Sequence, residues 1–439
     1  MNKFKKSPYL YEYTTEKGDF ICVNSFSNLY LKIRKEEKHD FDEVLANPKE
    51  SELNTLLEKG LLVSSDFDIE KENEKILEEY LEKKDKLHLI ILPTEGCNFR
   101  CKYCYENHKP QKMSKDTEAA LLQFVREKLP KYKGLFIDWF GGEPLLEKEM
   151  INRLSYGLRS VCRELKKPFC AAMTTNGYTL DRDTFKTMFS NRVTDYQITL
   201  DGPSITHDKY RPFVNGKGTF DVILENLKRI RDEEKSQFIR VIIRCNITAS
   251  VLNVFDEYVD VIEKEFGNDK RFGVLWKIAW NPTPEKESDD YCKAETLDVL
   301  LKKYQGRKII FPSIFSQYSK YGKVCYAGKP NSFVIRSDGV ISKCTVDFDN
   351  EKNNLGNLKN VLNVGINQEK MDYWSKHDFL PLCKNCLLFP SCLGIHCPKK
   401  KRDEKGERIC FHSFDEDKIY FEYMANNKDC YMEWNDLWK

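Results

Sequence analysis

Short apolar runs alternate with helical patterns through the middle of the chain, between Leu87 and Trp280. Runs of this length are typical of buried strands, and the segments between them have the spacing of amphipathic helices. Strands that alternate with helices form a parallel sheet with helical crossovers. We therefore predict an α/β fold of about six β/α units, built as an open sheet or a partial barrel. The runs are Leu87–Leu92, Leu135–Phe140, Phe169–Met173, Tyr196–Leu200, Val241–Ile247 and Val274–Trp280, and the helical patterns lie near Lys115–Lys128, Lys148–Leu165, Arg182–Phe189, Phe220–Asp232 and Val254–Phe266.

The residues before Leu87 have a different pattern. Three alternating stretches are followed by two short helical segments and one more apolar stretch, which predicts a small mixed α/β unit of the winged-helix type. The stretch from Asp68 to Lys86 is highly charged and has few apolar residues, so we expect a solvated linker helix there. The other segments are Tyr9–Thr14, Phe20–Val23, Leu29–Ile33, Phe41–Ala46, Ser51–Lys59 and Leu61–Val63.

A protein of 439 residues suffices for about two to four domains. We predict divisions at 1–85, 86–290, a bridging region 291–320, and 321–439. Lysine and arginine exceed aspartate and glutamate by 71 − 69 = 2, so the overall charge indicates no nucleic-acid partner. No apolar run approaches the roughly 18–20 residues that span a bilayer. We expect a cytoplasmic monomer with neither a nucleic-acid nor a membrane partner.

The sequence has 16 cysteines, and they are unevenly distributed. In a reducing compartment such cysteines indicate metal binding or catalysis rather than disulfides. Three of them crowd between Cys97 and Cys104, and seven gather near the C-terminal end. The other six are scattered, and all but Cys292 are expected to be small buried hydrophobic residues. The seven are Cys325, Cys344, Cys383, Cys386, Cys392, Cys397 and Cys410, and the scattered six are Cys22, Cys162, Cys170, Cys245, Cys292 and Cys430.

The sequence Cys97-x3-Cys101-x2-Cys104 follows the first predicted strand, at the carboxyl end of the sheet, where α/β sites lie. A cysteine-bound [4Fe–4S] cluster and a structural zinc ion each normally take four protein ligands. Three close cysteines therefore suggest an iron with one position open to a substrate. His108 would complete a zinc set, but its spacing and flanking residues argue against this.

These residues resemble the radical SAM superfamily, whose C-x3-C-x2-C loop has an aromatic residue before the last cysteine, here Tyr103. Gly141-Gly142-Glu143-Pro144 resembles the family turn that receives the amino group of S-adenosylmethionine (SAM). The resemblance implies that Thr199 contacts the ribose of SAM and Arg211 its carboxylate. Other matches are Thr175-Asn176-Gly177, Thr199-Leu200-Asp201-Gly202-Pro203, His207-Asp208-x2-Arg211 and Asn246, for which a capping or turn role is an equal alternative. The implied cofactor-binding residues are Tyr103, Gly141, Gly142, Glu143, Asn176, Thr199 and Arg211, and the implied ligands of the first cluster are Cys97, Cys101 and Cys104.

The C-terminal cysteines resemble the SPASM extension, which holds two auxiliary [4Fe–4S] clusters. By this resemblance Cys325, Cys344 and Cys397 hold the nearer cluster, and the farther one is held by Cys383, Cys386, Cys392 and Cys410. Four residues separate Cys392 from Cys397, one more than the family usually has, and a bulge would absorb the difference. The nearer cluster lacks a fourth ligand, for which Cys292 and an open site are the alternatives. Two structural zinc ions are the alternative for all seven cysteines.

The three resemblances together indicate a maturase of a ribosomally made peptide. Enzymes of this superfamily use SAM to make a 5′-deoxyadenosyl radical, and auxiliary clusters suit a net oxidation. The expected cofactors are SAM and three [4Fe–4S] clusters, and the expected partners are a precursor peptide with its leader and an electron donor such as flavodoxin or ferredoxin. The N-terminal unit resembles a recognition element that holds a leader peptide as an added strand; a structural cap is the alternative.

In size and layout the protein resembles the streptococcal streptide cyclases, which join a lysine carbon to a tryptophan ring carbon. A thioether-forming sactipeptide-type maturase is the first alternative, and an anaerobic sulfatase maturase the second. A non-catalytic iron–sulfur carrier or peptide-binding protein is the third, and it leaves Gly142, Glu143 and Arg211 without a purpose. The sequence assigns no residue to the removal of the substrate proton.

Overall fold

The computed structural model describes residues 3–279, 290–293, 295–309, 318–376, 380–394, 397–399, 410 and 414–438. Its largest element is a nine-stranded sheet in the order β11-β10-β9-β8-β7-β6-β12-β13-β14. The first six of these strands are parallel neighbours that follow one another along the sequence, which confirms the predicted β/α units. They are β6 (Lys86–Ile91), β7 (Gly134–Trp139), β8 (Phe169–Thr175), β9 (Val193–Thr199), β10 (Arg240–Ile247) and β11 (Phe272–Ile278).

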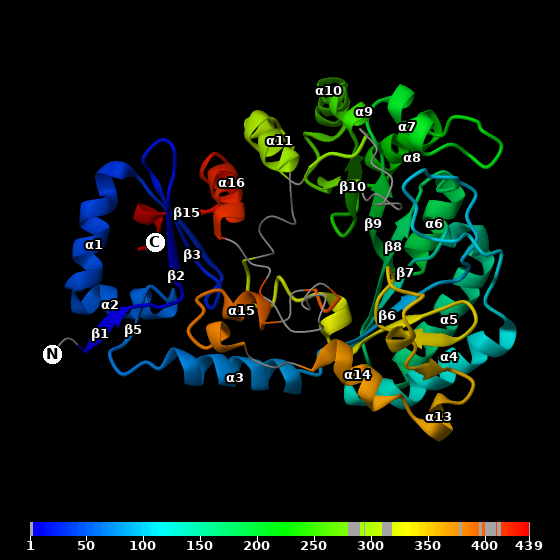
Figure 1. Cartoon of the computed structure of the whole chain (residues 1–439), viewed down its shortest axis with the longest axis horizontal. Coiled ribbons are helices and arrows are strands. Elements are labelled where there is room, and N and C mark those ends of the chain that lie inside the picture. The colour runs from blue at the N-terminus through cyan, green and yellow to red at the C-terminus, as the bar shows by residue number, and fades with distance from the viewer. Residues whose placement is uncertain are drawn as a thin grey trace.

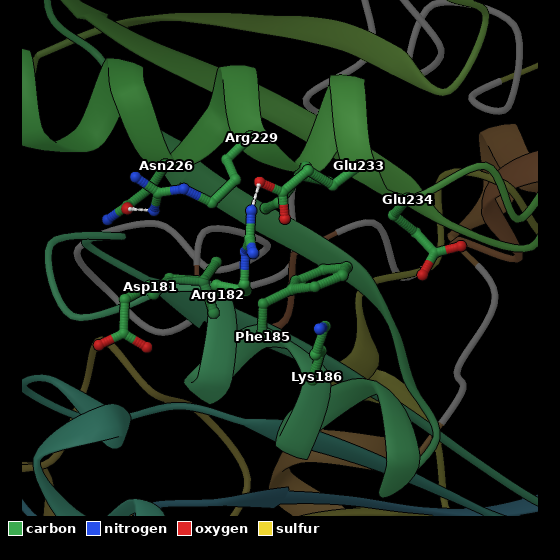
Figure 2. Close-up of a pocket in the computed structure, with 10 residues that line it drawn as sticks. Asp181, Arg182, Phe185, Lys186, Asn226, Arg229, Glu233 and Glu234 are labelled. Carbon is green, nitrogen blue, oxygen red and sulfur yellow. Dashed lines mark hydrogen bonds and ion pairs between the residues drawn. The ribbon is translucent and has the colours of Figure 1, made fainter.

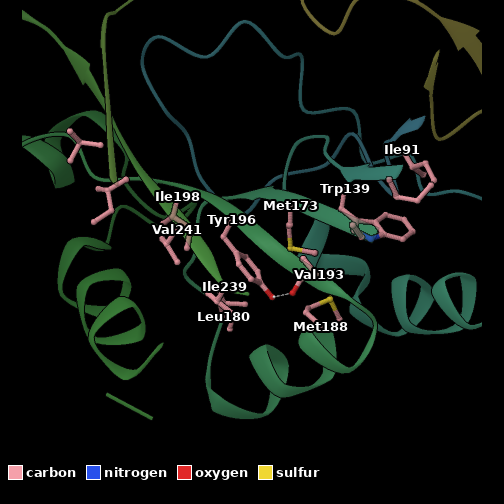
Figure 3. Close-up of a cluster of buried hydrophobic side chains, with 14 of the residues drawn as sticks. Ile91, Trp139, Met173, Leu180, Met188, Val193, Tyr196, Ile198, Ile239 and Val241 are labelled. Carbon is pink, nitrogen blue, oxygen red and sulfur yellow. Dashed lines mark hydrogen bonds between the residues drawn. The ribbon is translucent and has the colours of Figure 1, made fainter. Parts of the chain in front are cut away.

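The connecting helices cover the outer face of this sheet (Figure 1). Along β7, the outward residues Leu135, Ile137 and Trp139 are fully buried, because the helices pack onto them. The buried cluster in Figure 3 joins such strand residues to helix and loop residues, and the Tyr196 hydroxyl within it donates to the carbonyl of Val193 across 3.3 Å. The helices are α4 (Lys115–Lys128), α5 (Lys148–Glu164), α6 (Arg182–Ser190), α7 (Ser204–Tyr210), α8 (Phe220–Glu233), α9 (Ala249–Leu252) and α10 (Phe255–Phe266).

Three further strands extend the sheet beyond β6, where the sequence analysis expected only a loss of the strand–helix pattern. Strand β12 (Ser332–Ile335) pairs in parallel with β6, and β13 (Val340–Ser342) returns antiparallel to it and pairs with β14 (Gly356–Asn357). The β12–β13 turn places Gly339 at φ +85°, a conformation that glycine adopts without strain. The sheet therefore joins the radical SAM-like units to the C-terminal cysteine region.

The N-terminal domain has an antiparallel meander of β2 (Leu10–Thr14), β3 (Phe20–Asn24) and β4 (Leu29–Ile33), as its alternating stretches predict. Two helices follow, α1 (Lys38–Ala46) and α2 (Glu50–Glu58), and then β5 (Leu62–Ser64), which pairs with β1 (Phe4–Lys6). A strand from the other end of the sequence completes the meander. Strand β15 (Met432–Glu433) pairs in parallel with β4 at its outer edge.

The charged segment after β5 differs from the expected solvated linker. It forms α3 (Ile69–Glu82), whose Ile76, Leu77 and Tyr80 are buried against Val324 and Phe389 near the C-terminal cysteines. Asn73, also buried, accepts from the Tyr9 hydroxyl across 2.7 Å and donates to the carbonyl of Cys383 across 3.3 Å. Few apolar residues suffice for docking here because they share one face of the helix.

Helices α16 (Phe414–Ala425) and α11 (Thr296–Tyr304) lie between the N-terminal domain and the large sheet (Figure 1). Phe421 of α16 contacts the rings of Tyr11 and Tyr13, and the hydroxyl of Tyr423 donates to the carbonyl of Ile309 across 3.0 Å. Within the described ranges, no helix combines the length and apolar character that a bilayer crossing needs.

Candidate active site

The cysteine loop after β6 is held by backbone hydrogen bonds to the segment after α7. The amides of Arg100 and Lys102 donate to the carbonyls of Pro212 and Tyr210, each across 3.0 Å, and the amide of Val214 donates to the carbonyl of Asn98 across 2.8 Å. Because Arg211 lies in this segment, the loop that carries Cys97, Cys101 and Cys104 is fixed beside the predicted cofactor-binding arginine.

The three thiols of this loop are partly buried and electrostatically coupled. Burial, with a smaller contribution from the charge of Cys101, raises the pKa of Cys97 to about 12 and that of Cys104 to about 11. Sγ of Cys104 lies 3.3 Å from Nε2 of His108. Within the described ranges, no three cysteine, histidine or acidic side chains are gathered closely enough to hold a metal ion as they stand. The loop still fits a cluster with one open position, since its three thiols are near enough to act on one another and would lose their protons on binding iron.

The two glycines of the Gly141–Pro144 turn permit close contact with this loop. A Cβ on Gly141, which has φ +120°, would lie 2.3 Å from the carbonyl oxygen of Thr94, and one on Gly142 would lie 2.4 Å from that of Gly96. The amide of Glu143 donates to the same Gly96 carbonyl across 2.9 Å. A side chain at either glycine would therefore push the turn away from the cysteine loop.

The carboxylate of Glu143 is fully buried at the start of a short helix. One of its oxygens accepts from the amide of Leu145 across 2.9 Å and from the hydroxyl of Thr175 across 2.7 Å, and the other accepts from the amide of Asn176 across 2.7 Å. A carboxylate has about four acceptor positions, so one is left for the amino group that the resemblance assigns to it. The three protein donors also tie the end of β7 to the end of β8.

Asn176, in turn, is linked to the cysteine loop. Its side-chain amide donates to the side-chain oxygen of Asn98 across 2.7 Å, and its own side-chain oxygen accepts from the amide of Tyr178 across 3.0 Å. In the structure Asn176 thus positions the residue next to Cys97. Its role toward SAM stays a prediction.

Arg211 belongs to a buried polar network at the ends of β9 and β10. Its Nη1 donates to the hydroxyl of Tyr103 across 2.9 Å, and this hydroxyl donates to the carboxylate of Asp201. Asn246 donates from its backbone amide to Asp201 across 2.6 Å and from its side chain to Tyr103 across 3.2 Å. The sequence motifs include Asp201 and Asn246, but the hydrogen bonds of this network could not be predicted from them.

Nε of Arg211 is buried and has no hydrogen-bond partner in the described structure. A buried unpaired donor on a guanidinium is costly, so a carboxylate ligand such as that of SAM fits here. Thr199, the last residue of β9, is buried, pairs in register with Arg244, and lies two residues before Asp201. Its predicted contact with the ribose would place SAM across the carboxyl ends of these strands.

The thiols of the C-terminal cysteines influence one another's pKa values, and their grouping around two clusters stays a prediction. Burial raises the pKa of Cys344 to about 11, and the charges of Cys325 and Cys397 add to this shift. Burial likewise raises the pKa of Cys392 to about 12, with additions from Cys386 and Cys383, and Cys410 adds to the raised pKa of Cys386. These thiol sets fit two clusters or two zinc ions.

Cys292 is partly buried and lies near the carboxylate of Asp290. Its pKa is raised by burial and then by the carboxylate of Asp290. The neighbouring Tyr291 forms an isolated bridge to Thr248, just after β10. Cys292 and an open site remain the alternatives for the fourth ligand of the nearer cluster.

A cavity of about 1050 Å³ lies on the inner face of the large sheet. Its walls include Asp138, Thr174 and Gln197 from neighbouring strands, Tyr326 and Thr345 from the C-terminal cysteine region, and Tyr423 from α16. The cysteine loop and the Gly141 turn follow the carboxyl ends of the same strands. The much smaller pocket in Figure 2, about 40 Å³, lies between α6 and α8 on the outer face and contains the Arg182–Glu233 ion pair. Of these two, the large cavity has room for a side chain, and its lining also includes Arg240 and Gly273 at the amino ends of β10 and β11.

Residues 91–260 match the family model of the radical SAM superfamily. They form a radical SAM domain, the domain of enzymes that use SAM and a [4Fe–4S] cluster. Among curated proteins, the Fe-coproporphyrin III synthase of Methanosarcina barkeri is 26% identical over 183 residues, which are 42% of this chain and only 42% of that protein. The cysteine-type anaerobic sulfatase-maturating enzyme of Clostridium novyi is 25% identical over 347 residues, 70% of this chain and 86% of that protein. The solved structure of anSMEcpe with bound AdoMet and Cp18Cys peptide superimposes with a TM-score of 0.59 at 20% identity, covering 77% of this chain and 96% of that one.

Proposed function

We propose that this protein is a radical SAM maturase that oxidises a side chain of a ribosomally made precursor peptide. The observation that carries the proposal is the position of the cysteine loop, the Gly141 turn and Arg211 at the carboxyl ends of strands whose inner face lines a cavity of about 1050 Å³. A radical made at these strand ends would meet a substrate side chain held in that cavity.

The residues that would hold the cofactors follow from their chemistry. The thiols of Cys97, Cys101 and Cys104 would bind the first cluster, and the unpaired Nε of Arg211 would bind the carboxylate of SAM. When bound and reduced, these groups supply a 5′-deoxyadenosyl radical. The protein itself orients SAM through Glu143 and the Arg211 network and encloses the substrate.

We assign two auxiliary [4Fe–4S] clusters to the C-terminal cysteines, which gives three clusters in all. Cys325, Cys344 and Cys397 would hold the nearer one, and Cys292 and an open site are the alternatives for its fourth position. Cys383, Cys386, Cys392 and Cys410 would hold the farther one. Tyr326 and Thr345, which follow Cys325 and Cys344, line the cavity, so an electron leaving the substrate has a short route to the nearer cluster.

The proposed substrate is a peptide, in line with the Cp18Cys peptide bound to anSMEcpe in the superimposed structure. We propose that its leader binds the N-terminal domain. The outer edge of β4 is occupied by β15, so β2 is the other outer strand of that sheet. The electron donor for the first cluster would be a flavodoxin or ferredoxin.

For the bond formed, we propose a lysine–tryptophan carbon–carbon crosslink of the streptide type. The N-terminal domain and the C-terminal cysteine region on either side of the β/α units support it, because the resemblance to the streptide cyclases rests on this layout. A cysteine oxidation of the sulfatase-maturase type is the second candidate, because the Clostridium novyi relative matches 70% of this chain.

Anaerobic reconstitution with iron and sulfide, followed by SAM and dithionite, tests the proposal. We expect 5′-deoxyadenosine from the wild type and none from Cys101→Ala, whereas Cys170→Ala, a cysteine outside the clusters, behaves as the wild type. Mass spectrometry of a lysine- and tryptophan-containing peptide would show the loss of two hydrogens. A cysteine-containing peptide would instead exchange its thiol for an aldehyde. Full iron loading without 5′-deoxyadenosine would support a carrier or binding protein instead.

A further inference from the structure

A carboxylate, an imidazole and a hydroxyl from three neighbouring strands form a hydrogen-bonded row beside the cavity. Oδ2 of Asp138 lies 2.7 Å from Nε2 of His88, and Nδ1 of His88 lies 3.0 Å from Oγ of Ser332. The Asp138 side chain, 33% exposed, lines the cavity, whereas that of His88 is 15% exposed and lies behind it. One carboxylate oxygen is thus engaged by the imidazole, and Oδ1 is left for the cavity.

The sheet registry builds this row. His88 of β6 lies opposite both Phe136 of β7 and Ser332 of β12, and Asp138 follows Phe136 by two residues on the same face. The rings of Phe136 and Tyr326 lie 5.0 Å and 6.4 Å from the His88 ring. Packing therefore fixes the imidazole in the orientation that reaches Asp138 on one side and Ser332 on the other.

The cavity contains a second carboxylate that lacks this support. Asp195 lies in the same row of the sheet as Asp138, with Ala172 between them, because a bulge at Thr194 turns it toward the inner face. The hydroxyl of Thr194 donates to Asp195 across 2.8 Å. None of the described hydrogen bonds of Asp195 involves a histidine. The two carboxylates thus share a cavity, but among the described hydrogen bonds only that of Asp138 is held by an imidazole.

We propose that Asp138 is the proton acceptor in the oxidation of the peptide side chain, and that His88 and Ser332 position it. The inference rests on the proposed function and names the residue that the sequence left unassigned. SAM and the first cluster, when bound, would supply the 5′-deoxyadenosyl radical, to which a C–H bond of that side chain would lose one hydrogen atom. The resulting carbon radical would then form a new bond. In the lysine–tryptophan peptide the bond joins it to an aromatic ring carbon. In the cysteine peptide it is a second bond to the neighbouring sulfur.

The balance of this step requires the loss of one electron and one proton. The electron would go to an iron–sulfur cluster at the thiols of Cys325, Cys344 and Cys397, and the proton, from the ring carbon or from the heteroatom, would go to Oδ1 of Asp138. The imidazole of His88 orients the carboxylate through Oδ2, and Ser332 orients the imidazole through Nδ1. Atoms and charge balance for both candidate substrates.

The test compares the reconstituted wild type with Asp138→Asn, using the lysine–tryptophan and the cysteine peptide as probes, each deuterated at the side-chain methylene. We expect Asp138→Asn to form deuterated 5′-deoxyadenosine at a rate near that of the wild type but to lose about a hundredfold or more of modified peptide, the usual contribution of a general base. Asp138→Glu should restore part of the product. Asp195→Asn, the matched control from the same cavity, should retain it.

A positioning role for His88 is tested separately. His88→Gln should lower kcat for product with little change in KM for the peptide, and should raise the solvent deuterium isotope effect on product formation. A merely structural role would lower 5′-deoxyadenosine and product together. If Asp138→Asn keeps product formation, or if Asp195→Asn loses it instead, Asp138 is not the proton acceptor. If the wild type forms no 5′-deoxyadenosine or modifies neither peptide, the proposed function fails, and the inference fails with it.

Discussion

The side-chain amide of Asn176 donates to the side-chain oxygen of Asn98 across 2.7 Å, which joins the loop after β8 to the cysteine loop after β6. Glu143 holds the backbone amide of the same Asn176. The turn, the third strand end and the residue beside Cys97 therefore form one connected unit. Motifs that are far apart in the sequence are linked by hydrogen bonds, so a substitution in one motif should alter the positions of the others.

Replacing Glu143 with glutamine tests this coupling. The glutamine amide would point an N–H group at the donors that hydrogen-bond to the Glu143 carboxylate. We therefore expect the free energy of unfolding to fall by about 1–3 kcal/mol. The affinity for SAM should fall as well. Urea unfolding and calorimetric SAM titration measure the two effects. Glu147→Gln is the matched control, because Glu147 pairs with the exposed Lys112, an ion pair worth about 0–1 kcal/mol.

Arg211→Lys keeps the positive charge but removes the buried Nε donor. Since a hydrogen bond to a charged group contributes about 1.5–3 kcal/mol, we expect SAM affinity to drop by about tenfold or more. Equilibrium dialysis with labelled SAM checks this. Arg229→Lys, in the small outer pocket of Figure 2, should bind SAM as the wild type does. Equal affinities for both variants would remove Arg211 from the cofactor site.

The three cysteines of the first loop should be needed for the iron that carries catalysis. Cys101→Ala should lose the iron of one cluster and all cleavage of SAM, while the C-terminal thiols keep their own iron. Iron and sulfide analysis with Mössbauer spectroscopy distinguishes the clusters. A zinc content that rises in the wild type in place of iron would favour structural zinc sites at the C-terminal cysteines.

Burial, and then the charge of Arg211, hold the pKa of His207 well below 6.5. The neutral ring accepts from the amide of Asp201 across 3.1 Å and lies 3.1 Å from the Thr219 hydroxyl. Below about pH 6.5 this histidine binds a proton in the unfolded protein but not in the native one. The free energy of unfolding should therefore fall by up to about 1.4 kcal/mol for each unit by which the pH is lowered. Above that pH the histidine should have no effect.

Urea midpoints of the wild type and of His207→Gln across this range measure the difference. The variant should lose this part of the acid destabilisation. His39→Gln replaces a histidine whose side chain is 92% exposed and should follow the wild type. Parallel pH profiles for all three proteins would contradict the assignment.

Trp434 is buried against Phe41, and its Nε1 donates to the carboxylate of Asp40 across 3.2 Å. Trp434→Ala should therefore destabilise the N-terminal domain by about 3–5 kcal/mol. Hydrogen exchange followed by mass spectrometry should show faster exchange in β2–β4, with the large sheet unchanged. Trp438→Ala, at a position 40% exposed, should have a much smaller effect.

The sequence predicted the elements whose signal is local. Runs such as Leu135–Phe140 and Val241–Ile247 form β7 and β10 to within a residue or so, because the residues that face the covering helices are apolar at every second position. Strand β12 was not predicted, since Ser332–Ile335 is short and its partner β6 lies far away in the sequence. The docking of α3 was also missed, because Ile76 and Tyr80 form a face only once the C-terminal cysteine region is folded.

The site shows the same division. Cys97, Gly141 and Arg211 carry recognisable spacings, and the structure brings their segments together. The pairing of His88 with Asp138 leaves no such trace, because residues 50 positions apart meet only through the register of β6 with β7. A contact that depends on the register between two strands cannot be predicted from the spacing of residues along the sequence. This holds even when each residue lies on a correctly predicted strand.

Strand β15 determines when the N-terminal domain can finish folding. The sheet of the N-terminal domain receives its fourth strand, and the core beside Phe41 receives Trp434, from residues made almost four hundred positions later; Trp434 follows its partner Asp40 by 394 residues. The N-terminal domain thus leaves the ribosome well before the strand that completes its sheet. Until then its β4 edge is unpaired, and an unpaired edge is where proteins aggregate.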